Sequence, residues 1–321
     1  MALISRDIFQ AAKALNEGEV IGIPTETVYG LAGNALDGNV VAKIFEVKER
    51  PSFDPLIVHV SGVDQVSEYC EKIPEPLAKL ADNFWPGPLT LLLPRKKIIP
   101  DIVTSGLPRV AVRVPSHPLT LELLKNLDFP LAAPSANPFG YISPTTAAHV
   151  NAQLGEKIPF VLDGGNSQIG LESTIAGMEG DEAVIYRLGG LSIDSIENLI
   201  GKVKVTSHSS SNPQAPGLLK SHYAPKVPFR LGDIEVLLKE SEVENERIGI
   251  LSLSKEFDQI TPLNQVQLSP SGNLNEAAQN LFAAMRKLDD LDIDLILAEP
   301  MPESGLGKAI NDRLRRAAVK D

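Results

Sequence analysis

The stretch from residue 23 to residue 60, IPTETVYGLAGNALDGNVVAKIFEVKERPSFDPLIVHV, decides the fold. It starts in an apolar strand over residues 20–24, contains a helix over residues 40–48 and ends in an apolar strand over residues 56–60. Strand and helix patterns keep alternating through residue 206, which predicts an α/β fold. Thr25 and Thr27 bracket Glu26 at the end of the first strand, where a packed core does not require polar groups.

The loop that follows this helix carries three charged residues. Lys48 and Arg50 lie two residues apart at the predicted helix C-terminus, and Asp54 follows between Pro51 and Pro55. Two cations held close together on a proline-stiffened loop form a favourable site for a polyanion. The alternative is that these cations only complement the negative end of the helix dipole.

Composition limits the class of protein. The chain has 321 residues, 43% of them hydrophobic and 22% charged, which is typical of a globular protein with room for one large domain or two ordinary ones. Its apolar runs are too short to span a membrane, and its N-terminus is typical of a helix capped by Ser5, not of a signal peptide. The single cysteine, Cys70, excludes a disulfide framework and is expected to be a small buried residue. We therefore expect a cytoplasmic protein.

Charge is distributed unevenly along the chain. The net charge of −11 disfavours non-specific binding to nucleic acid. Residues 1–206 carry −7 and residues 230–321 carry −6, whereas residues 207–229 carry +2. Serine, proline and glycine in this middle segment predict a linker, and its His222 and Tyr223 suggest that it docks elsewhere as a lid.

The predicted organisation is therefore a first domain over residues 1–206, a linker or lid over residues 207–229, and a second domain over residues 230–321. In the second domain, strand patterns at 248–253 and 293–298 alternate with helix patterns at 274–288 and 307–319. This order predicts a small Rossmann-like, three-layer α/β domain with a parallel sheet.

Six polar residues of the first domain stand at strand ends or in turns that leave strands: Lys48, Arg50, Ser135, Asn137, Ser143 and Arg187. Ligands of α/β sheets bind at strand ends, and ammonium, guanidinium, hydroxyl and amide groups together suit a triphosphate. We therefore expect a nucleotide site there. Taken singly, each residue is more often a surface or capping residue: Ser143 precedes a predicted helix as an N-cap, and Ser135 and Asn137 flank a proline-rich turn.

Other common site motifs are missing from the sequence. It contains no Walker A loop, no G-x-G-x-x-G turn that opens a helix and no H-E-x-x-H. Its five histidines show no metal-ligand spacing, and His59 in the second strand has no triad partner in the sequence pattern. A bound nucleotide would therefore be held by side chains and strand-end amides.

Motifs spread over nearly the whole chain resemble the YrdC-like domain family. PTETVYGL at 24–31, KERP followed by PLIVH at 48–59 and SAN at 135–137 match its hallmark, a Lys-x-Arg followed far downstream by Ser-x-Asn. VRVP at 112–115, SPT at 143–145, EST at 172–174 and the arginine of YRLGG at 186–190 also fit. HYAP in the linker and the terminal GLGKAINDRLRRAA resemble the longer, two-domain members.

The resemblance implies an L-threonylcarbamoyladenylate synthase, a nucleotidyltransferase that combines L-threonine, bicarbonate and ATP and releases pyrophosphate. Its product would feed the threonylcarbamoyl modification of a tRNA adenosine next to the anticodon. The implied threonine-binding residues are Thr27, His59, Arg113, Ala133 and Ser173. The implied ATP-binding residues are Lys48, Arg50, Asp54, Arg109, Ser135, Asn137, Ser143 and Arg187, to which we add Tyr223 of the predicted lid as a hypothesis. Asp54 stands where asparagine is common in the family, and Arg109 where a small hydroxyl residue is common.

Further expectations concern the metal and the partners. Mg²⁺ is expected with ATP, and neither a protein ligand for the metal nor a general base is assigned. The expected partner is the downstream tRNA threonylcarbamoyl transferase machinery, with indirect or weak contact to tRNA and no contact with a membrane. The alternative is an RNA-binding protein that uses the same cationic groove. The net negative charge and the lack of an interleaved basic and aromatic stripe count against this alternative.

Overall fold

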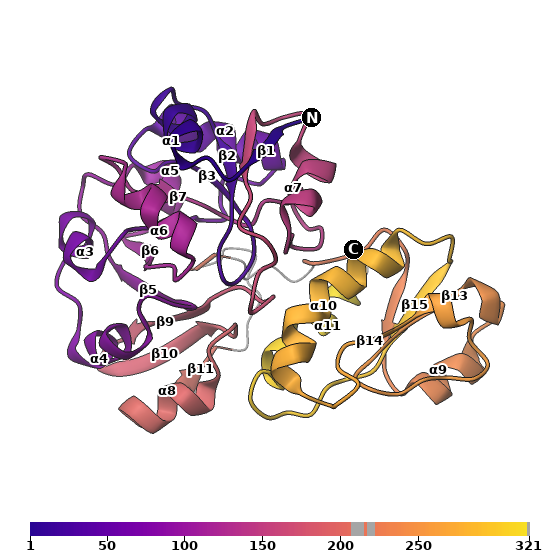
Figure 1. Cartoon of the computed structure of the whole chain (residues 1–321). Helices are drawn as coiled ribbons and strands as arrows, with labels where there is room; N and C mark the ends of the chain where they lie inside the picture. Colours follow the sequence, from indigo (N-terminus) through magenta and orange to yellow (C-terminus); the bar gives the residue numbers. More distant parts are fainter. Residues whose placement is uncertain (207–214, 217–221, 320–321) are drawn as a thin grey trace. The chain divides into compact units, whose positions relative to one another are not determined.

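A computed structural model describes residues 1–206, 215–216 and 222–319. The chain divides into two compact units, coloured by sequence in Figure 1. Unit 1 comprises Met1–Phe139, Ser143–Gln168 and Glu172–Leu219, and unit 2 comprises Gly140–Ile142, Ile169–Leu171 and Lys220–Asp321. Of the predicted linker, residues 207–214 and 217–221 lie outside the described residues.

Unit 1 is built on an 11-stranded mixed sheet with the order β1-β8-β2-β3-β7-β4-β6-β5-β9-β10-β11. Its strands are short: β1 (Leu3–Ser5), β2 (Ile21–Ile23), β3 (Gly30–Asn34), β4 (Ile57–His59), β5 (Leu89–Pro94), β6 (Arg109–Arg113), β7 (Leu131–Ala132), β8 (Phe160–Leu162), β9 (Thr174–Glu179), β10 (Glu182–Arg187) and β11 (Lys204–Val205). β4 runs parallel to β6, β6 antiparallel to β5, and β5 parallel to β9. These four neighbouring strands carry the candidate site.

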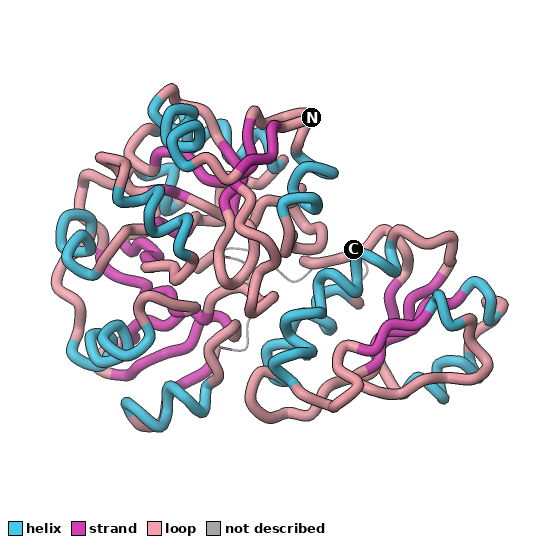
Figure 2. The backbone as a smooth tube through the Cα atoms, in the orientation of Figure 1, coloured by secondary structure: helices cyan, strands magenta, loops and turns pink. Residues whose placement is uncertain are grey.

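The helices of unit 1 are α1 (Ile8–Asn16), α2 (Gly38–Lys48), α3 (Val63–Tyr69), α4 (Glu75–Phe84), α5 (Asp101–Thr104), α6 (Pro118–Lys125), α7 (Ala147–Leu154) and α8 (Ile193–Ile200). Figure 2 shows them as cyan turns around the magenta strands. α1 packs on α6 and on β8, β2 and β3, whereas α2 packs on β3 and on α5. The alternation of strands and helices confirms the α/β fold predicted for the first domain.

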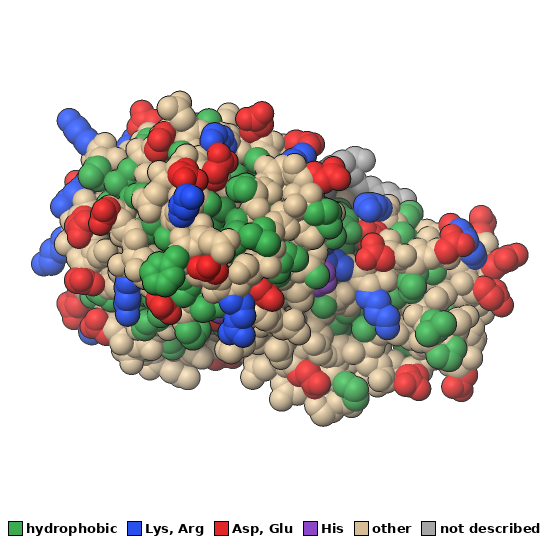
Figure 3. Space-filling model, turned by 45° about the horizontal axis from the view of Figure 1, so that its top comes forward, with side chains coloured by type: hydrophobic (Ala, Val, Ile, Leu, Met, Phe, Trp, Pro, Cys, Tyr) green, Lys and Arg blue, Asp and Glu red, His purple; other side chains and the backbone are tan. Residues whose placement is uncertain are grey.

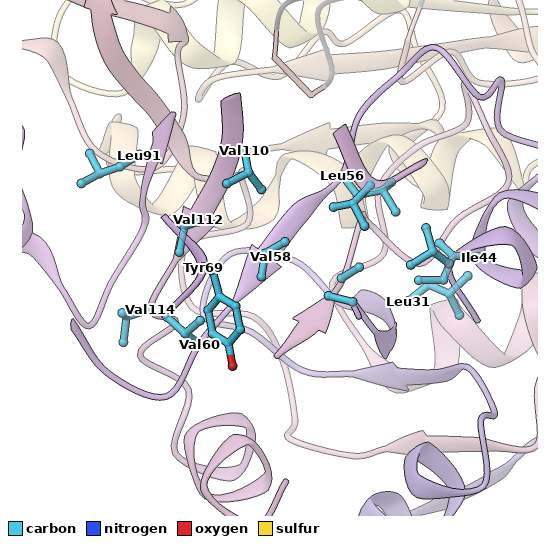
Figure 4. Close-up of a cluster of buried hydrophobic side chains, with 14 of the residues drawn as sticks. Leu31, Ile44, Leu56, Val58, Val60, Tyr69, Leu91, Val110, Val112 and Val114 are labelled. Carbon is cyan, nitrogen blue, oxygen red and sulfur yellow. The ribbon is translucent and has the colours of Figure 1, made fainter. Parts of the chain in front are cut away.

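Alternating side chains give the sheet two apolar faces. On one face Leu31, Val58 and Val112 belong to a large buried cluster, part of which Figure 4 shows. On the other face a smaller cluster spans β4, β6, β5, β9 and β10 and includes Ile57 and Ala111. Cys70 is buried in the large cluster, which confirms the prediction for the single cysteine.

Two predicted helix caps are wrong. α1 is capped by Asp7, whose carboxylate accepts from the backbone N–H of Phe9 and Gln10, because Ser5 instead belongs to β1. α7 is capped by Thr146, whose hydroxyl accepts from the N–H of His149. Ser143 lies three residues too early for that role, and its hydroxyl makes a different contact, described below.

Unit 2 contains a four-stranded, fully parallel sheet with the order β12-β15-β13-β14. Its elements are β12 (Phe229–Leu231), α9 (Ile234–Glu240), η1 (Asn245–Arg247), β13 (Ile248–Ser252), η2 (Pro262–Asn264), β14 (Gln265–Gln267), α10 (Leu274–Asp289), β15 (Leu295–Ala298) and α11 (Gly307–Ala317). α10 and α11 pack on each other and on the sheet, and α9 packs on β15. The predicted small Rossmann-like domain with a parallel sheet is confirmed.

Within the described ranges, none of the helices combines the length and the apolar character that crossing a bilayer requires. On the face shown in Figure 3, the Lys and Arg side chains are interspersed with Asp and Glu side chains. This mixture is not what a continuous nucleic-acid-binding stripe looks like.

Candidate functional site

A row of polar side chains crosses four neighbouring strands of unit 1. The register pairs His59, the last residue of β4, with Arg113, the last residue of β6. Leu91 of β5 pairs with Val112, so that Thr90 lies beside Arg113 in the next strand. Ser173 immediately precedes β9 and extends the row, because it shares the face of Ile175, which pairs with Thr90, and its hydroxyl contacts that of Thr90. We call His59, Arg113, Thr90 and Ser173 the strand row.

The strand row lies on the face of the sheet that carries the smaller apolar cluster. That cluster consists of Ile57, Leu92, Ala111, Ile175, Val184, Tyr186 and Ala215. His59 follows Ile57, and Arg113 follows Ala111, by two positions, so each polar residue shares the face of its apolar neighbour. The row therefore forms the polar border of an apolar layer at the carboxyl ends of β4 and β6, where α/β sheets bind ligands.

The turn after β2 brings a hydroxyl onto Arg113. The Thr25 hydroxyl accepts from the N–H groups of Thr27 and Val28, both at 3.2 Å, and donates to the carbonyl of Val28 at 2.6 Å. It also lies 2.7 Å from the Thr27 hydroxyl. Since the single proton of Thr25 is used, Thr27 must donate in that pair. Thr27 Oγ1 then accepts from Arg113 Nη1 at 2.9 Å.

Arg113 also has two further partners. Its Nη2 lies 2.5 Å from Oε1 of Glu26, and its Nε donates to the carbonyl of Gly87 at 3.3 Å. The second carboxylate oxygen of Glu26 accepts from the backbone N–H of Ser116 at 3.1 Å. Both charged side chains are buried, with 4% and 5% of their surface exposed.

His59 is a neutral group in this row. Burial lowers the pKa of its imidazole to about 3, and the positive charge of Arg113 acts in the same direction. Within the part of the chain that the structure describes, its Nδ1 atom has no hydrogen-bond partner. A buried neutral imidazole can offer one nitrogen to a substrate without adding charge.

Ser173 joins the strand row to the predicted nucleotide residues. Its hydroxyl lies 2.7 Å from that of Thr90. Arg187, at the end of β10, donates from Nη2 to the carbonyl and hydroxyl oxygens of Ser173 at 2.9 and 3.1 Å. A register shift between Ile185 and Arg187 places Arg187 opposite Ile175, on the face of the strand row.

Lys48, the last residue of α2, is buried against another loop. The helix ends in a left-handed turn at Glu49, with φ of 55°, and the chain reverses there. The ammonium group of Lys48 donates to the carbonyls of Ser135 and Asn137, both at 2.5 Å. Burial, and secondarily the charge of Arg50, hold the pKa of Lys48 well below its ordinary value.

Arg50 and Asp54 pair with each other across their loop. The distance from Nη2 to Oδ2 is 2.9 Å, and Arg50 also donates to the carbonyls of Asp54 and Pro55 at 3.0 and 2.9 Å. The pair is buried. The guanidinium therefore stiffens the loop that carries it.

Two other predicted ATP residues of unit 1 contact different partners. The Ser143 hydroxyl donates to Oε1 of Glu172 at 2.7 Å, next to Ser173 in sequence, and both side chains are buried. Arg109, at the start of β6, donates to the Tyr186 hydroxyl at 2.9 Å and lies 5.1 Å from the centre of that ring. It lies four positions before Arg113 in the same strand, which corresponds to about 13 Å along the strand.

The last two predicted residues are placed as follows. Ala133 donates its backbone N–H to the carbonyl of Ile57 at 3.0 Å, beside the strand row. Tyr223 belongs to unit 2, where its buried ring stacks on Phe282 with centres 5.3 Å apart. The guanidinium groups of Arg313 and Arg316 lie 5.4 and 5.0 Å from the centre of the same ring. The proposed place of Tyr223 over the nucleotide stays a prediction.

Sequence reasoning did not assign Glu26, Thr90 or Glu172 to the site. Thr90 had a local signal, because it is a hydroxyl residue within the apolar strand 89–93. Glu26 stood between two threonines at a strand end, but its partner lies 87 positions away. Among the described residues, no group of three or more His, Cys, Asp or Glu side chains is arranged to hold a metal ion.

Comparisons with known proteins identify the family of the chain. A family model described as "Telomere recombination" matches residues 13–189, and one described as "Threonylcarbamoyl-AMP synthase, C-terminal domain" matches residues 191–319. Relatives called threonylcarbamoyl-AMP synthase in Pyrococcus abyssi and Bacillus subtilis are each 40% identical to the chain. The alignments cover 96% and 97% of this chain and 93% and 92% of the relatives.

A solved structure gives the same result. The crystal structure of P. abyssi Sua5 complexed with L-threonine superposes with a TM-score of 0.92 at 38% identity, covering 99% of this chain and 97% of that one. The resemblance seen in the sequence motifs is thereby confirmed over both units. The chain is an enzyme that belongs to the threonylcarbamoyl-AMP synthase family.

Proposed function

We propose that unit 1 joins L-threonine, bicarbonate and ATP into L-threonylcarbamoyladenylate and releases pyrophosphate. The product then serves the modification of a tRNA adenosine next to the anticodon. The observation that carries the proposal is the contact of Arg187 with Ser173, because it joins a residue of the nucleotide group to the strand row. Two substrates bound at the two groups would meet at that point.

The amino-acid substrate binds at the strand row. Arg113 takes the carboxylate, since a guanidinium matches that group with two parallel hydrogen bonds. The neutral His59, the hydroxyl groups of Thr27 and Ser173 and the backbone at Ala133 surround the rest of the molecule. The apolar layer that borders the row suits the methyl group of threonine.

ATP binds at the nucleotide group, which consists of Lys48, Arg50, Asp54, Ser135, Asn137, Ser143 and Arg187, with Arg109 and Tyr223 as further contacts. Arg187 ends β10 and Arg50 lies on the loop after α2, and their buried guanidinium groups are the proposed donors to the phosphates. Lys48 acts by fixing the loop of Ser135 and Asn137.

The reaction needs positioning and charge neutralisation more than covalent catalysis. The threonine amine attacks carbon dioxide and gives up one proton, or attacks bicarbonate, whose hydroxyl leaves with that proton as water. Either route forms a carbamate. A carbamate oxygen then attacks the α-phosphorus, the bond to the β-phosphate oxygen breaks, and pyrophosphate leaves. The chain's own residues orient both substrates and keep water from the labile carbamate.

Mg²⁺ is proposed to arrive with ATP. Asp54 is the one carboxylate assigned to the nucleotide group, and magnesium sites in such enzymes use one or two carboxylates together with substrate phosphates. The residues present therefore fit a metal that is held mainly by the triphosphate, where it would neutralise phosphate charge.

The proposed setting is cytoplasmic, with the downstream tRNA threonylcarbamoyl transferase machinery as the partner that takes the product. Contact with tRNA is indirect or weak in this proposal. The mixed surface charge of Figure 3 supports this over an RNA-binding role.

The test is a product assay. Purified full-length protein is mixed with ATP, Mg²⁺, bicarbonate and L-threonine, and pyrophosphate and the adenylate are followed by mass spectrometry. Each component is omitted in turn, and we expect both products to require all four. ATP turnover that does not depend on threonine, or threonine dependence without bicarbonate, would contradict the proposal.

A further inference from the structure

We infer that Glu26 is a positioning residue that fixes the guanidinium of Arg113 as a two-donor fork for the carboxylate of the amino-acid substrate. The inference rests on the proposed role of Arg113 in threonine binding. It adds a residue to that role, since Glu26 acts through Arg113 and through no direct contact with substrate.

Three nitrogens of the Arg113 guanidinium each donate to a different acceptor. Nε donates to the Gly87 carbonyl, Nη1 to the Thr27 hydroxyl and Nη2 to Glu26. A guanidinium has five N–H groups, so these contacts leave one N–H on each terminal nitrogen among the described residues. One donor on each terminal nitrogen is the arrangement that binds a carboxylate through two hydrogen bonds.

Glu26 is the strongest of the three acceptors and is itself held in place. Its contact with Arg113 is charge-assisted and short, at 2.5 Å, whereas the other two are neutral and measure 2.9 and 3.3 Å. Its second oxygen is held by the backbone N–H of Ser116, so the carboxylate cannot swing away without losing that bond. The orientation of Arg113 is therefore set by the fixed backbone after β6.

The same contact balances charge. A buried arginine without a partner attracts any anion or moves toward solvent, because burial of an unpaired charge is costly. With Glu26 beside it, Arg113 adds no net charge to the strand row, and the neutral His59 adds none either. The row then selects a carboxylate by geometry and not by net charge.

The experiment compares two ligands and three proteins. Binding of L-threonine and of threoninol, in which CH₂OH replaces the carboxylate, is measured by calorimetry for the wild-type protein, Glu26→Gln and Arg113→Gln. The wild-type protein is expected to prefer threonine, and Arg113→Gln to lose that preference. Glu26→Gln keeps the shape of the side chain but loses the charge-assisted bond. The ratio of the dissociation constant for threoninol to that for threonine is therefore expected to fall about 10-fold.

The outcomes separate the two proposals. A reduced ratio in Glu26→Gln, with threoninol binding unchanged, supports the inference. A wild-type ratio in Glu26→Gln, or tighter threonine binding once Arg113 is freed of its counter-charge, overturns the inference while the role of Arg113 stands. A wild-type ratio in Arg113→Gln overturns the proposed role of Arg113, and the inference with it.

Two further variants guard against a purely structural effect. Glu26→Asp keeps the charge but shortens the side chain, so it should give the same change at smaller size even if Glu26→Gln does not fold. Glu172→Gln is the matched control, since Glu172 is also buried and also accepts from a site residue, Ser143. It should weaken ATP binding and leave the ratio for threonine and threoninol unchanged.

Discussion

The strand row and the nucleotide group of unit 1 are held in place by different means. His59 and Arg113 are neighbours because the register of β4 and β6 makes them so. Lys48 and Arg50 lie in and beside a helix end, and they are held by hydrogen bonds to loop carbonyls. A strand fixes its side chains through the whole sheet, whereas a loop residue depends on a few local bonds. Changes in the row should therefore act on one substrate, and changes in the loops should spread to neighbouring residues.

The largest expected effect comes from Arg113→Lys. Lysine keeps the charge but has no planar fork, so kcat/KM for threonine should fall at least about 100-fold, while KM for ATP changes less than about 2-fold. Steady-state kinetics with each substrate varied in turn measure both values. A rise of similar size in KM for ATP would contradict the separation of the two sites.

The next largest effect is expected from Lys48→Met, which tests the nucleotide group. The change removes two hydrogen bonds and leaves the carbonyls of Ser135 and Asn137 without their ammonium partner. The loop that carries them then loses its fixed position, so KM for ATP is expected to rise about 30-fold, or about 2 kcal/mol, which lies within the range of about 1–3 kcal/mol for a lost hydrogen-bond partner. Lys43→Met on the same helix is the control, because it removes an exposed bond to the Gly18 carbonyl and an exposed ion pair with Glu19, both outside the nucleotide group. If it raises KM as much, the effect does not come from the loop.

How much of the two groups can be predicted from the sequence depends on how far apart in the chain the interacting residues lie. The period-two pattern of residues 110–114 places Arg113 on the face opposite Val112 and Val114, since alternation is a local property of a strand. The Lys-x-Arg loop was also found from sequence, because proline and charge mark it locally. The contact of Glu26 with Arg113 was not, since no local pattern specifies which distant strand a turn will meet.

The wrong helix caps have a different physical cause. Ser5 and Asp7 both precede α1, and Ser143 and Thr146 both precede α7, so each helix had two candidate caps. Which residue caps the helix depends on where the contacts of the preceding strand or loop end. Ser5 pairs with Leu162 in the sheet, and Ser143 pairs with Glu172, so tertiary contacts decided both cases.

For His59 the test is the pH dependence of the free energy of unfolding, not the kinetics. Its folded pKa of about 3 lies below the ordinary value of 6.5, so the folded state binds fewer protons than the unfolded state. The stability that follows is fully present above pH 6.5 and is lost as pH falls toward 3, with a slope of at most about 1.4 kcal/mol per pH unit. Between pH 6 and pH 5 the wild-type protein should lose about 1 kcal/mol more than His59→Gln does, measured by urea unfolding. Parallel curves for the two proteins would show that His59 is charged or solvated in the folded state.

The smallest expected effect concerns Thr90, where the strand row meets Ser173. Thr90→Val keeps the shape but removes the hydroxyl that lies 2.7 Å from Ser173, so KM for threonine should rise about 3- to 5-fold, or about 1 kcal/mol. Thr90→Ser restores the hydroxyl and should recover most of this loss. Because Ser173 stays bound to Arg187, KM for ATP should not change. A parallel rise in both KM values would instead mean that the Ser173 hydroxyl transmits the change to Arg187, and that the two groups are coupled at their point of contact.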